Sequence, residues 1–262
     1  GTSKTASFSP SLSSGTQQVS FYDQAEKIVT IPLTFITVLS TTVMPRLANE
    51  YAKKNTKAIE KLLNKSGAIS LLMAFPMMFG LCLIANNFIG WYLGEEFSTS
   101  AYVIMVLSPI VISNSLTSIS ATQYFTATNQ IKIISKSYVI VAIVNVIINA
   151  LLIPQYGCVG AAVATVISSY LSLLIQYREF VKQVDVKSML KLGLKYAGLS
   201  AITIIGSYLI SMFLDDGVLK TCIQVIVAIV IYLLLLIITK DVCLKECFQM
   251  VLEKIVKRKG NK

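Results

Sequence analysis

The sequence predicts an all-α, polytopic membrane helix bundle. Of the 262 residues, 55% are hydrophobic and only 14% are charged, whereas a soluble domain has roughly 25% charged residues. The mean hydropathy is +0.70, and long apolar runs recur along the chain. A membrane-spanning helix needs about 20 such residues. The pattern therefore predicts several spans joined by short polar connections.

Seven spans can be placed in order on these apolar runs. They cover Tyr22–Met44, Ser66–Leu93, Tyr102–Tyr124, Ile131–Ile153, Gly157–Tyr177, Leu192–Leu214 and Leu219–Thr239. Pro32, Pro76 and Pro109 lie inside the first three. Because proline removes a helical hydrogen bond, we expect kinks there, as in helices that line a cavity or bend during a transport cycle, although stable bundles contain kinks too.

The basic residues are distributed asymmetrically. All of the 23 lysines and arginines except Lys4, Lys27 and Lys220 lie in the connections after the first, third and fifth spans or in the C-terminal tail. Lysine and arginine favour the cytoplasmic side of a membrane. We therefore expect the C-terminus inside and the N-terminus outside. This topology also explains the net charge of +10, so a nucleic-acid partner is not expected.

Two basic segments predict amphipathic helices on the inner membrane surface, in contact with membrane lipids. One is the connection after the first span, residues 49–65, and the other is the tail, residues 241–262. In the tail, apolar side chains share one helical face and lysines cover the other, which is typical of binding to an anionic leaflet.

The first span carries a polar stripe on an otherwise apolar helix. Its members recur at spacings of three and four, and so share one face: Asp23, Lys27, Thr30, Thr34, Thr37 and Thr41. Polar groups in lipid are costly unless they are paired or face water. The stripe therefore predicts a helix face turned toward water, with Asp23 and Lys27 near its outer mouth.

The third and fourth spans carry further polar side chains. The candidates for a shared cavity are Asn114, Ser115 and Gln123 in the third span and Tyr138, Asn145 and Asn149 in the fourth. For any one of them, interhelical hydrogen bonding is the simpler explanation. Three helices with aligned stripes favour a hydrated central cavity.

The fifth span has small residues four apart. Gly160, Ala164 and Ser168 form one row, and Ala161, Thr165 and Ser169 form another. Small residues at this spacing allow helix backbones to approach closely, so we interpret them as packing positions.

No constellation for catalysis or metal binding is found in the sequence. Histidine is absent, and the five cysteines lack metal-site or redox spacing. The paired carboxylates, Glu95/Glu96 and Asp215/Asp216, fall in outer connections. We therefore expect a protein that is not an enzyme and uses no cofactor or metal.

Several segments resemble a known family. "LIPQYGCVGAAVAT" with the preceding Asn145 and Asn149, the stretch from Ser14 to Tyr51, and "KSGAISLLMAFPMMFGLCLIANNFIGWYLGEEFSTSAYVIMVLSP" are similar to bacterial polysaccharide-repeat-unit flippases. These are the Wzx-like members of the multidrug/oligosaccharidyl-lipid/polysaccharide exporter superfamily. The resemblance implies a two-lobed transporter that moves undecaprenyl-pyrophosphate-linked oligosaccharide across the bacterial cytoplasmic membrane by alternating access. Lys27 would suit the pyrophosphate, and the hydroxyls and amides would suit the sugar.

The resemblance also implies a division of the chain. Residues 14–182 correspond to the five spans of a C-terminal lobe, 183–240 to two additional spans and 241–262 to the cytoplasmic tail. Residues 1–13 stand where another helix is expected and are polar, so we expect them to be a non-native or disordered stretch. We also expect the chain to be an incomplete half that requires the missing N-terminal lobe or another copy as a partner.

Ser169 lies where many relatives carry a glutamate, which leaves ion coupling by that helix open. The alternatives are a lipid II or drug exporter of the same superfamily, a non-transporting membrane subunit, and a membrane enzyme, for which the outer connections are short.

Overall fold

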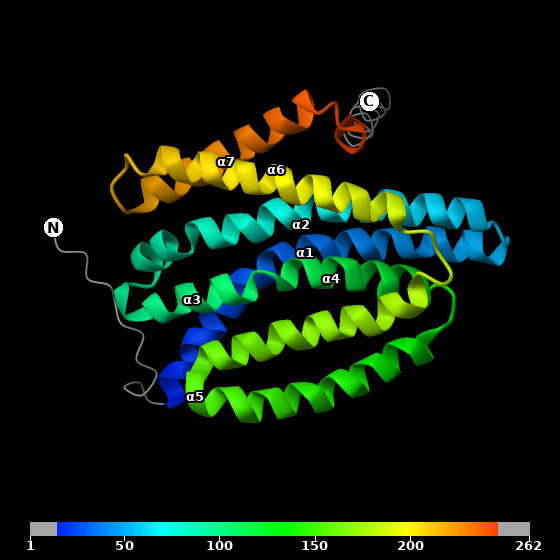
Figure 1. The fold of residues 1–262 in the computed structure, drawn as a ribbon, viewed down its shortest axis with the longest axis horizontal. Helices are drawn as coiled ribbons and strands as arrows, with labels where there is room; N and C mark the ends of the chain where they lie inside the picture. Colours follow the sequence, from blue (N-terminus) through cyan, green and yellow to red (C-terminus); the bar gives the residue numbers. More distant parts are fainter. Residues whose placement is uncertain (1–14, 246–262) are drawn as a thin grey trace, which may run out of the picture.

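The computed structural model describes residues 15–245, and its elements are all helices. Figure 1 shows them lying side by side along the long axis of the molecule. The long helices are α1 (Gly15–Ala52), α2 (Thr56–Tyr92), α5 (Ile131–Phe180), α6 (Lys187–Ser211) and α7 (Val218–Ile238). Between α2 and α5 come a 3₁₀ turn, η2 (Glu95–Phe97), then α3 (Ser98–Leu107), α4 (Ile110–Ser118) and a π-helix, η3 (Ile119–Phe125).

The predicted class, a polytopic membrane helix bundle, is confirmed. Within residues 15–245, five helices are long and apolar enough to cross a membrane, and α3 with α4 and η3 makes a further, bent span. The helix α5 folds back on itself at Gly157, so its two arms correspond to the fourth and fifth predicted spans. The seven predicted spans thus each correspond to a helical segment.

The reversal of α5 occurs at Gly157, whose φ of 55° and ψ of −133° are not helical. The amide of Asn145 donates to Ser168 Oγ over 2.9 Å, although a straight helix would separate residues 23 apart by about 35 Å. A Cβ on Gly160 would lie 2.5 Å from the Leu152 carbonyl oxygen. The glycine of the small-residue row therefore does serve close packing, as predicted, here between the two arms of α5.

The third predicted span is broken. Its two parts meet at Ser108 and Pro109 with a bend of 42°, in line with the kink expected from Pro109. Pro32 and Pro76 remain inside continuous helices, and α1 changes direction along its length in Figure 1.

The prediction of a separate basic helix over residues 49–65 is wrong. The segment is divided at residues 53–55, so that its start completes α1 and its end begins α2. Asn55 caps α2 by accepting a hydrogen bond from the Ala58 N–H over 3.3 Å, which explains the restart. The sequence pattern missed this break because both parts are helical and basic.

The basic connections come together at one end of the bundle. The Asn64 amide donates to the Asp185 carbonyl, and the Tyr124 hydroxyl donates to Gln183, so the connections after α1, η3 and α5 are neighbours. At the opposite end, Asn87 binds the backbone of Gly217. This arrangement is visible in Figure 1. The predictions for residues 1–13 and for the tail beyond residue 245 lie outside the described residues.

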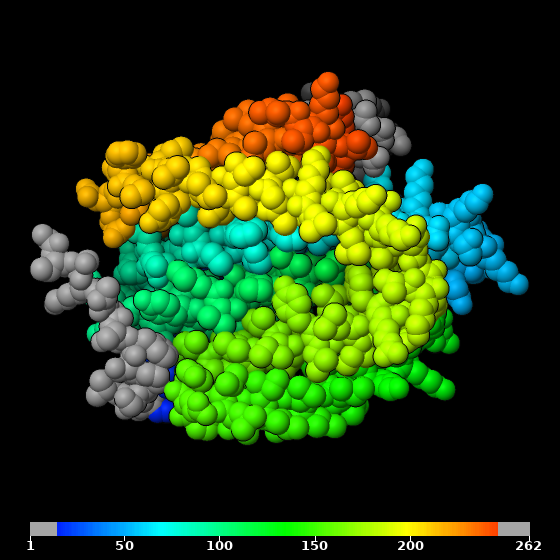
Figure 2. All heavy atoms as spheres, viewed as in Figure 1, coloured from blue at the N-terminus to red at the C-terminus, as the bar shows by residue number. Residues whose placement is uncertain are grey.

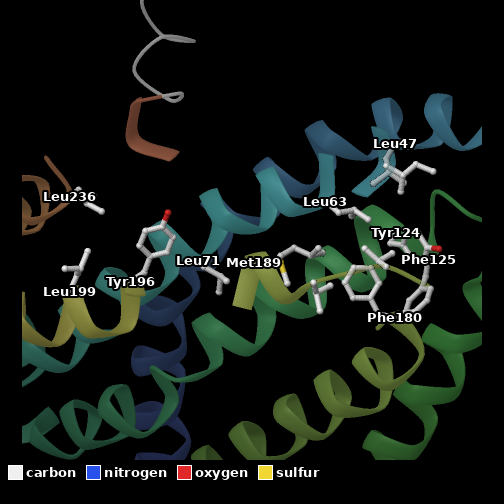
Figure 3. Packing of buried hydrophobic residues seen from close by; sticks show 14 of the residues in the cluster. Leu47, Leu63, Leu71, Tyr124, Phe125, Phe180, Met189, Tyr196, Leu199 and Leu236 are labelled. Atoms are coloured by element: carbon white, nitrogen blue, oxygen red, sulfur yellow. The ribbon is translucent and has the colours of Figure 1, made fainter. Parts of the chain in front are cut away.

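Two apolar clusters form the core. One lies toward the basic end and contains large side chains from α1, α2, η3, α5, α6 and α7, including Leu47, Phe125, Phe180, Met189 and Tyr196; Figure 3 shows them packed together. The other lies toward the opposite end and mixes alanines, namely Ala25, Ala74, Ala85, Ala101 and Ala162, with valine, isoleucine and leucine side chains. In Figure 2 the α5 hairpin, α6, α7 and parts of α2 and α3 form the visible face, and most of α1 is hidden.

Candidate functional site

The polar stripe of α1 lies on the exposed face of that helix. Asp23, Lys27, Thr30, Thr34, Thr37 and Thr41 are all exposed. Their neighbours on the same side are apolar and also exposed, namely Ile31, Phe35 and Val38 at 60%, 57% and 60%. By contrast Ile36, on the opposite side, is 2% exposed. The described chain therefore presents α1 as a polar strip edged by apolar side chains.

The threonine hydroxyls of the stripe satisfy their protons within the helix. Thr30 donates to the Glu26 carbonyl over 2.7 Å, Thr34 to Thr30 over 3.1 Å, and Thr37 to Leu33 over 2.9 Å; Thr41 bonds to the Val38 carbonyl. Each hydroxyl oxygen retains lone pairs that can accept from an external donor. A strip of this kind is stable without a ligand and can exchange its bonds for those of a polyhydroxylated molecule.

Asp23 and Lys27 form the charged end of the stripe. No ion pair involves either side chain among residues 15–245, although their spacing of four places them on the same face of α1. The exposed Lys27 ammonium group is a candidate for binding an anion, with the exposed carboxylates of Asp23 and Glu26 beside it.

The polar residues of the third span lie inside the bundle. Asn114 accepts from Ser169 Oγ over 3.0 Å. Ser115 is fully buried, and its hydroxyl has no hydrogen-bond partner in the structure. Gln123 is also fully buried, with partners Ser40 on α1 and Ser66 on α2. Asn114 and Gln123 thus form hydrogen bonds between helices, whereas Ser115 is buried without one.

The polar residues of the fourth span divide in two. Asn145 donates to Ser168 Oγ, and Asn149 donates to Asn145 Oδ1 over 2.9 Å, so this pair joins the two arms of α5. Tyr138 is 52% exposed and contributes to the outer surface of the first arm. The structure thus brings the six residues of α1 together and does not bring the other six around the same cavity.

Two hollows lie at the ends of α1, and none of the twelve candidates lines either of them. The first, of about 690 Å³, lies between the start of α1 and the turn of α5, with Gln18, Val19, Tyr22, Pro154 and Cys158 in its wall. The second, of about 470 Å³, lies at the basic end beside Tyr51, Lys54, Glu60, Tyr124 and Gln183. The first hollow adjoins the start of α1, the helix that carries the polar stripe.

Several contacts that shape this region could not be predicted from the sequence. Gln18 accepts a hydrogen bond from the Cys158 N–H over 3.0 Å, and so ties the start of α1 to the beginning of the second arm of α5. Tyr22 and Thr165 form a hydroxyl pair of 3.0 Å at the same junction. Partners 140 and 143 residues apart leave no periodic signal along the chain.

Comparison with known proteins provides a family assignment. The family model described as "Lipid II flippase MurJ" matches residues 5–232. The probable low-salt glycan biosynthesis flippase Agl15 of Haloferax volcanii is 30% identical over 150 residues, which are 57% of this chain and 32% of Agl15. Lipid II flippase MurJ of Bacillus subtilis is 25% identical over 152 residues, which are 57% of this chain and 28% of that protein.

A solved structure shows the same fold. The structure titled "Lipid II flippase MurJ, inward closed conformation" matches with a TM-score of 0.73 at 22% identity, covering 86% of this chain and 48% of that one. The chain matches about a third of the length of the curated relatives, and about half of the solved structure.

Proposed function

This chain belongs to the MurJ family of lipid II flippases, and we propose that it forms one wall of a flippase for lipid-linked oligosaccharides. The observation that carries the proposal is the exposed polar face of α1, with threonine hydroxyls along the span and Lys27 toward one end. A pyrophosphate-linked sugar cannot cross hydrocarbon, because its hydroxyl groups and charges would lose their water. A polar strip edged by apolar residues supplies replacement partners while the polyprenyl chain stays in lipid.

The proposed mechanism is alternating access by two lobes. Rocking of one lobe against the other would expose a site near the membrane midplane first to one side and then to the other. The described chain supplies one such lobe with α6 and α7 packed beside it, and α1 would face the opposite lobe. The protein would lie in the bacterial cytoplasmic membrane and act by binding and movement, with no chemical step.

The proposed substrate is an undecaprenyl-pyrophosphate-linked repeat unit. The 30% identity to a flippase named for glycan biosynthesis supports this choice, as does a stripe of neutral hydroxyls with one cation and one anion. Lipid II is the second candidate, favoured by the family match and by the Bacillus subtilis relative. The two substrates share the pyrophosphate, so Lys27 would serve either of them.

Binding to the chain in lipid nanodiscs tests the proposal. We expect the lipid-linked oligosaccharide to bind, with affinity reduced about tenfold by Lys27→Ala, since a charge-assisted hydrogen bond contributes about 1.5–3 kcal/mol. Lys27→Arg should retain binding because the cation is kept. Lys220→Ala is the matched control, because Lys220 lies at the same end and pairs with Asp216 over 2.8 Å.

Each outcome of the binding test has a distinct meaning. If Lys27→Ala and Lys220→Ala bind equally well, the site assignment is wrong. If lipid II binds more tightly than the oligosaccharide to the unaltered chain, the substrate assignment is wrong and the α1 site stands. Native mass spectrometry of the nanodisc complexes measures both quantities.

A further inference from the structure

The helix α1 has few fully buried side chains in its second half, where Leu39, Val43 and Met44 are only partly buried. Between the buried residues Ile36 and Leu47, the only buried side chain is Ser40. Pro32 lies just before this stretch and Pro45 lies within it, and each removes a backbone hydrogen bond from the helix. The rotation of this segment therefore depends on few contacts.

Ser40 is held by one side chain. Gln123 Nε2 donates to Ser40 Oγ over 3.0 Å, and Gln123 Oε1 accepts from Ser66 Oγ over 2.6 Å. Ser40 and Gln123 are fully buried, and Ser66 is 3% exposed. One amide thus joins α1, α2 and η3 inside the bundle.

The π-helix η3 brings Gln123 to this junction. The wider turn of this π-helix shows in the hydrogen bond that the Thr126 N–H donates to the Ala121 carbonyl, five residues back, over 3.0 Å. π-Helical turns are rare and are frequent at functional sites. Within η3, Thr122 alone is not buried, so the turn lies entirely between other helices.

The anchored segment carries part of the polar stripe. Thr37 and Thr41 flank Ser40 in sequence and lie on the exposed side of α1. A rotation of α1 about its axis that released Ser40 from Gln123 would move these hydroxyls off the exposed face. The contact to Gln123 therefore selects which residues α1 presents.

We infer that Gln123 is a positioning residue: its amide fixes the rotation of the second half of α1 and so keeps Thr37 and Thr41 on the exposed face. Gln123 acts through Ser40 and touches no substrate. The inference concerns helix orientation, so it holds whichever lipid-linked molecule the chain binds.

Cysteine accessibility in the full chain, assembled with a matching N-terminal lobe in lipid after replacement of the native cysteines, tests the inference. Single cysteines at Thr41 and Leu39 are labelled with a water-soluble maleimide, and their rates are compared. With Gln123 present, position 41 should react several-fold faster than position 39, which is only partly exposed. Gln123→Met keeps the length of the side chain but removes both hydrogen bonds. The ratio of the labelling rate at position 41 to that at position 39 should therefore fall toward one.

Two further variants make the test specific. Ser40→Ala removes the α1 partner but leaves the bond between Gln123 and Ser66, and it should lower the ratio as Gln123→Met does, with no further fall in the double variant. The control is Gln176→Met, since Gln176 is equally buried but bonds to Ser120, Ser137 and Ser172, none of them on α1.

The inference is overturned by either of two results. An unchanged ratio in Ser40→Ala would show that the contact does not orient α1, even if Gln123→Met failed to fold. An equal fall in Gln176→Met would show that any buried amide loss loosens the bundle. Neither result bears on binding of lipid-linked molecules at Lys27, which the nanodisc experiment measures separately.

Discussion

Asp241 shows how a single buried charge anchors the chain after the last span. Its side chain is fully buried, contacts Lys195 Nζ, and accepts hydrogen bonds from the Tyr196 hydroxyl over 3.3 Å and the Leu244 N–H over 3.1 Å. Burial alone would raise the pKa of Asp241, but the hydrogen bonds and the Lys195 charge outweigh it and hold the pKa below its ordinary value. The carboxylate therefore stabilises the folded state in its charged form.

The consequence is a pH-dependent stability. A group whose pKa is lowered by folding contributes stability above its unfolded pKa, about 3.9 for aspartate, and this contribution is lost as the pH falls through the folded value. We expect Asp241→Asn to lower stability by about 1–3 kcal/mol near neutral pH, and the difference from the unaltered chain to shrink below about pH 4. Thermal unfolding in detergent micelles across this range measures it.

The matched control for Asp241 is Asp216→Asn. Asp216 also pairs with a lysine, but its side chain is 83% exposed, and exposed ion pairs contribute little. Equal destabilisation by the two substitutions would contradict a special role for the buried carboxylate.

At the scale of the helix, α1 has one face that can be tested residue by residue. Thr34 and Thr37 are exposed, Leu33 is partly buried and Ile36 is buried. If the exposed face lines a hydrated cleft in the complete transporter, cysteines at 34 and 37 should react several times faster with a water-soluble thiol reagent than cysteines at 33 and 36. Slow reaction at all four positions would mean that this face is packed against another helix.

The helices were largely predictable from sequence, whereas their contacts were not. Runs of about 20 apolar residues locate spans because the hydrocarbon thickness sets their length, and all seven segments were found this way. The extent of α1 and α2 was underestimated, since the helices continue through basic residues into the polar layer. Gln123 was expected at a cavity, but its partners lie 57 and 83 residues away, and no local pattern records such pairs.

At the scale of the whole molecule, the clustering of basic connections predicts an orientation. Lys54 lies beside Gln183, the neighbour of Lys182, at the end where α1 meets α2, whereas Glu95 begins η2 after the other end of α2. We expect the lysine end to face the cytoplasm. In intact cells, a membrane-impermeant maleimide should label a cysteine at position 95 and leave positions 54 and 182 unlabelled until the cells are opened. The reverse pattern would invert the proposed orientation.

The exposed polar face of α1 also predicts what the 262-residue chain can do alone. Leaving Asp23, Lys27 and the stripe in hydrocarbon is unfavourable, although charges near a helix end cost less than the about 2.5–3.5 kcal/mol of a central charge on insertion scales, so the face requires a cover. Because the chain aligns with 48% of a solved flippase structure, we expect that cover to be a second lobe.

In cells that lack their own oligosaccharide flippase, the chain alone should fail to restore surface polysaccharide, and co-expression with a matching N-terminal lobe should restore part of it. Lys27→Ala should abolish most of the rescue, while Lys220→Ala should preserve it. Full rescue by the chain alone would instead mean that two copies cover each other and form a working transporter.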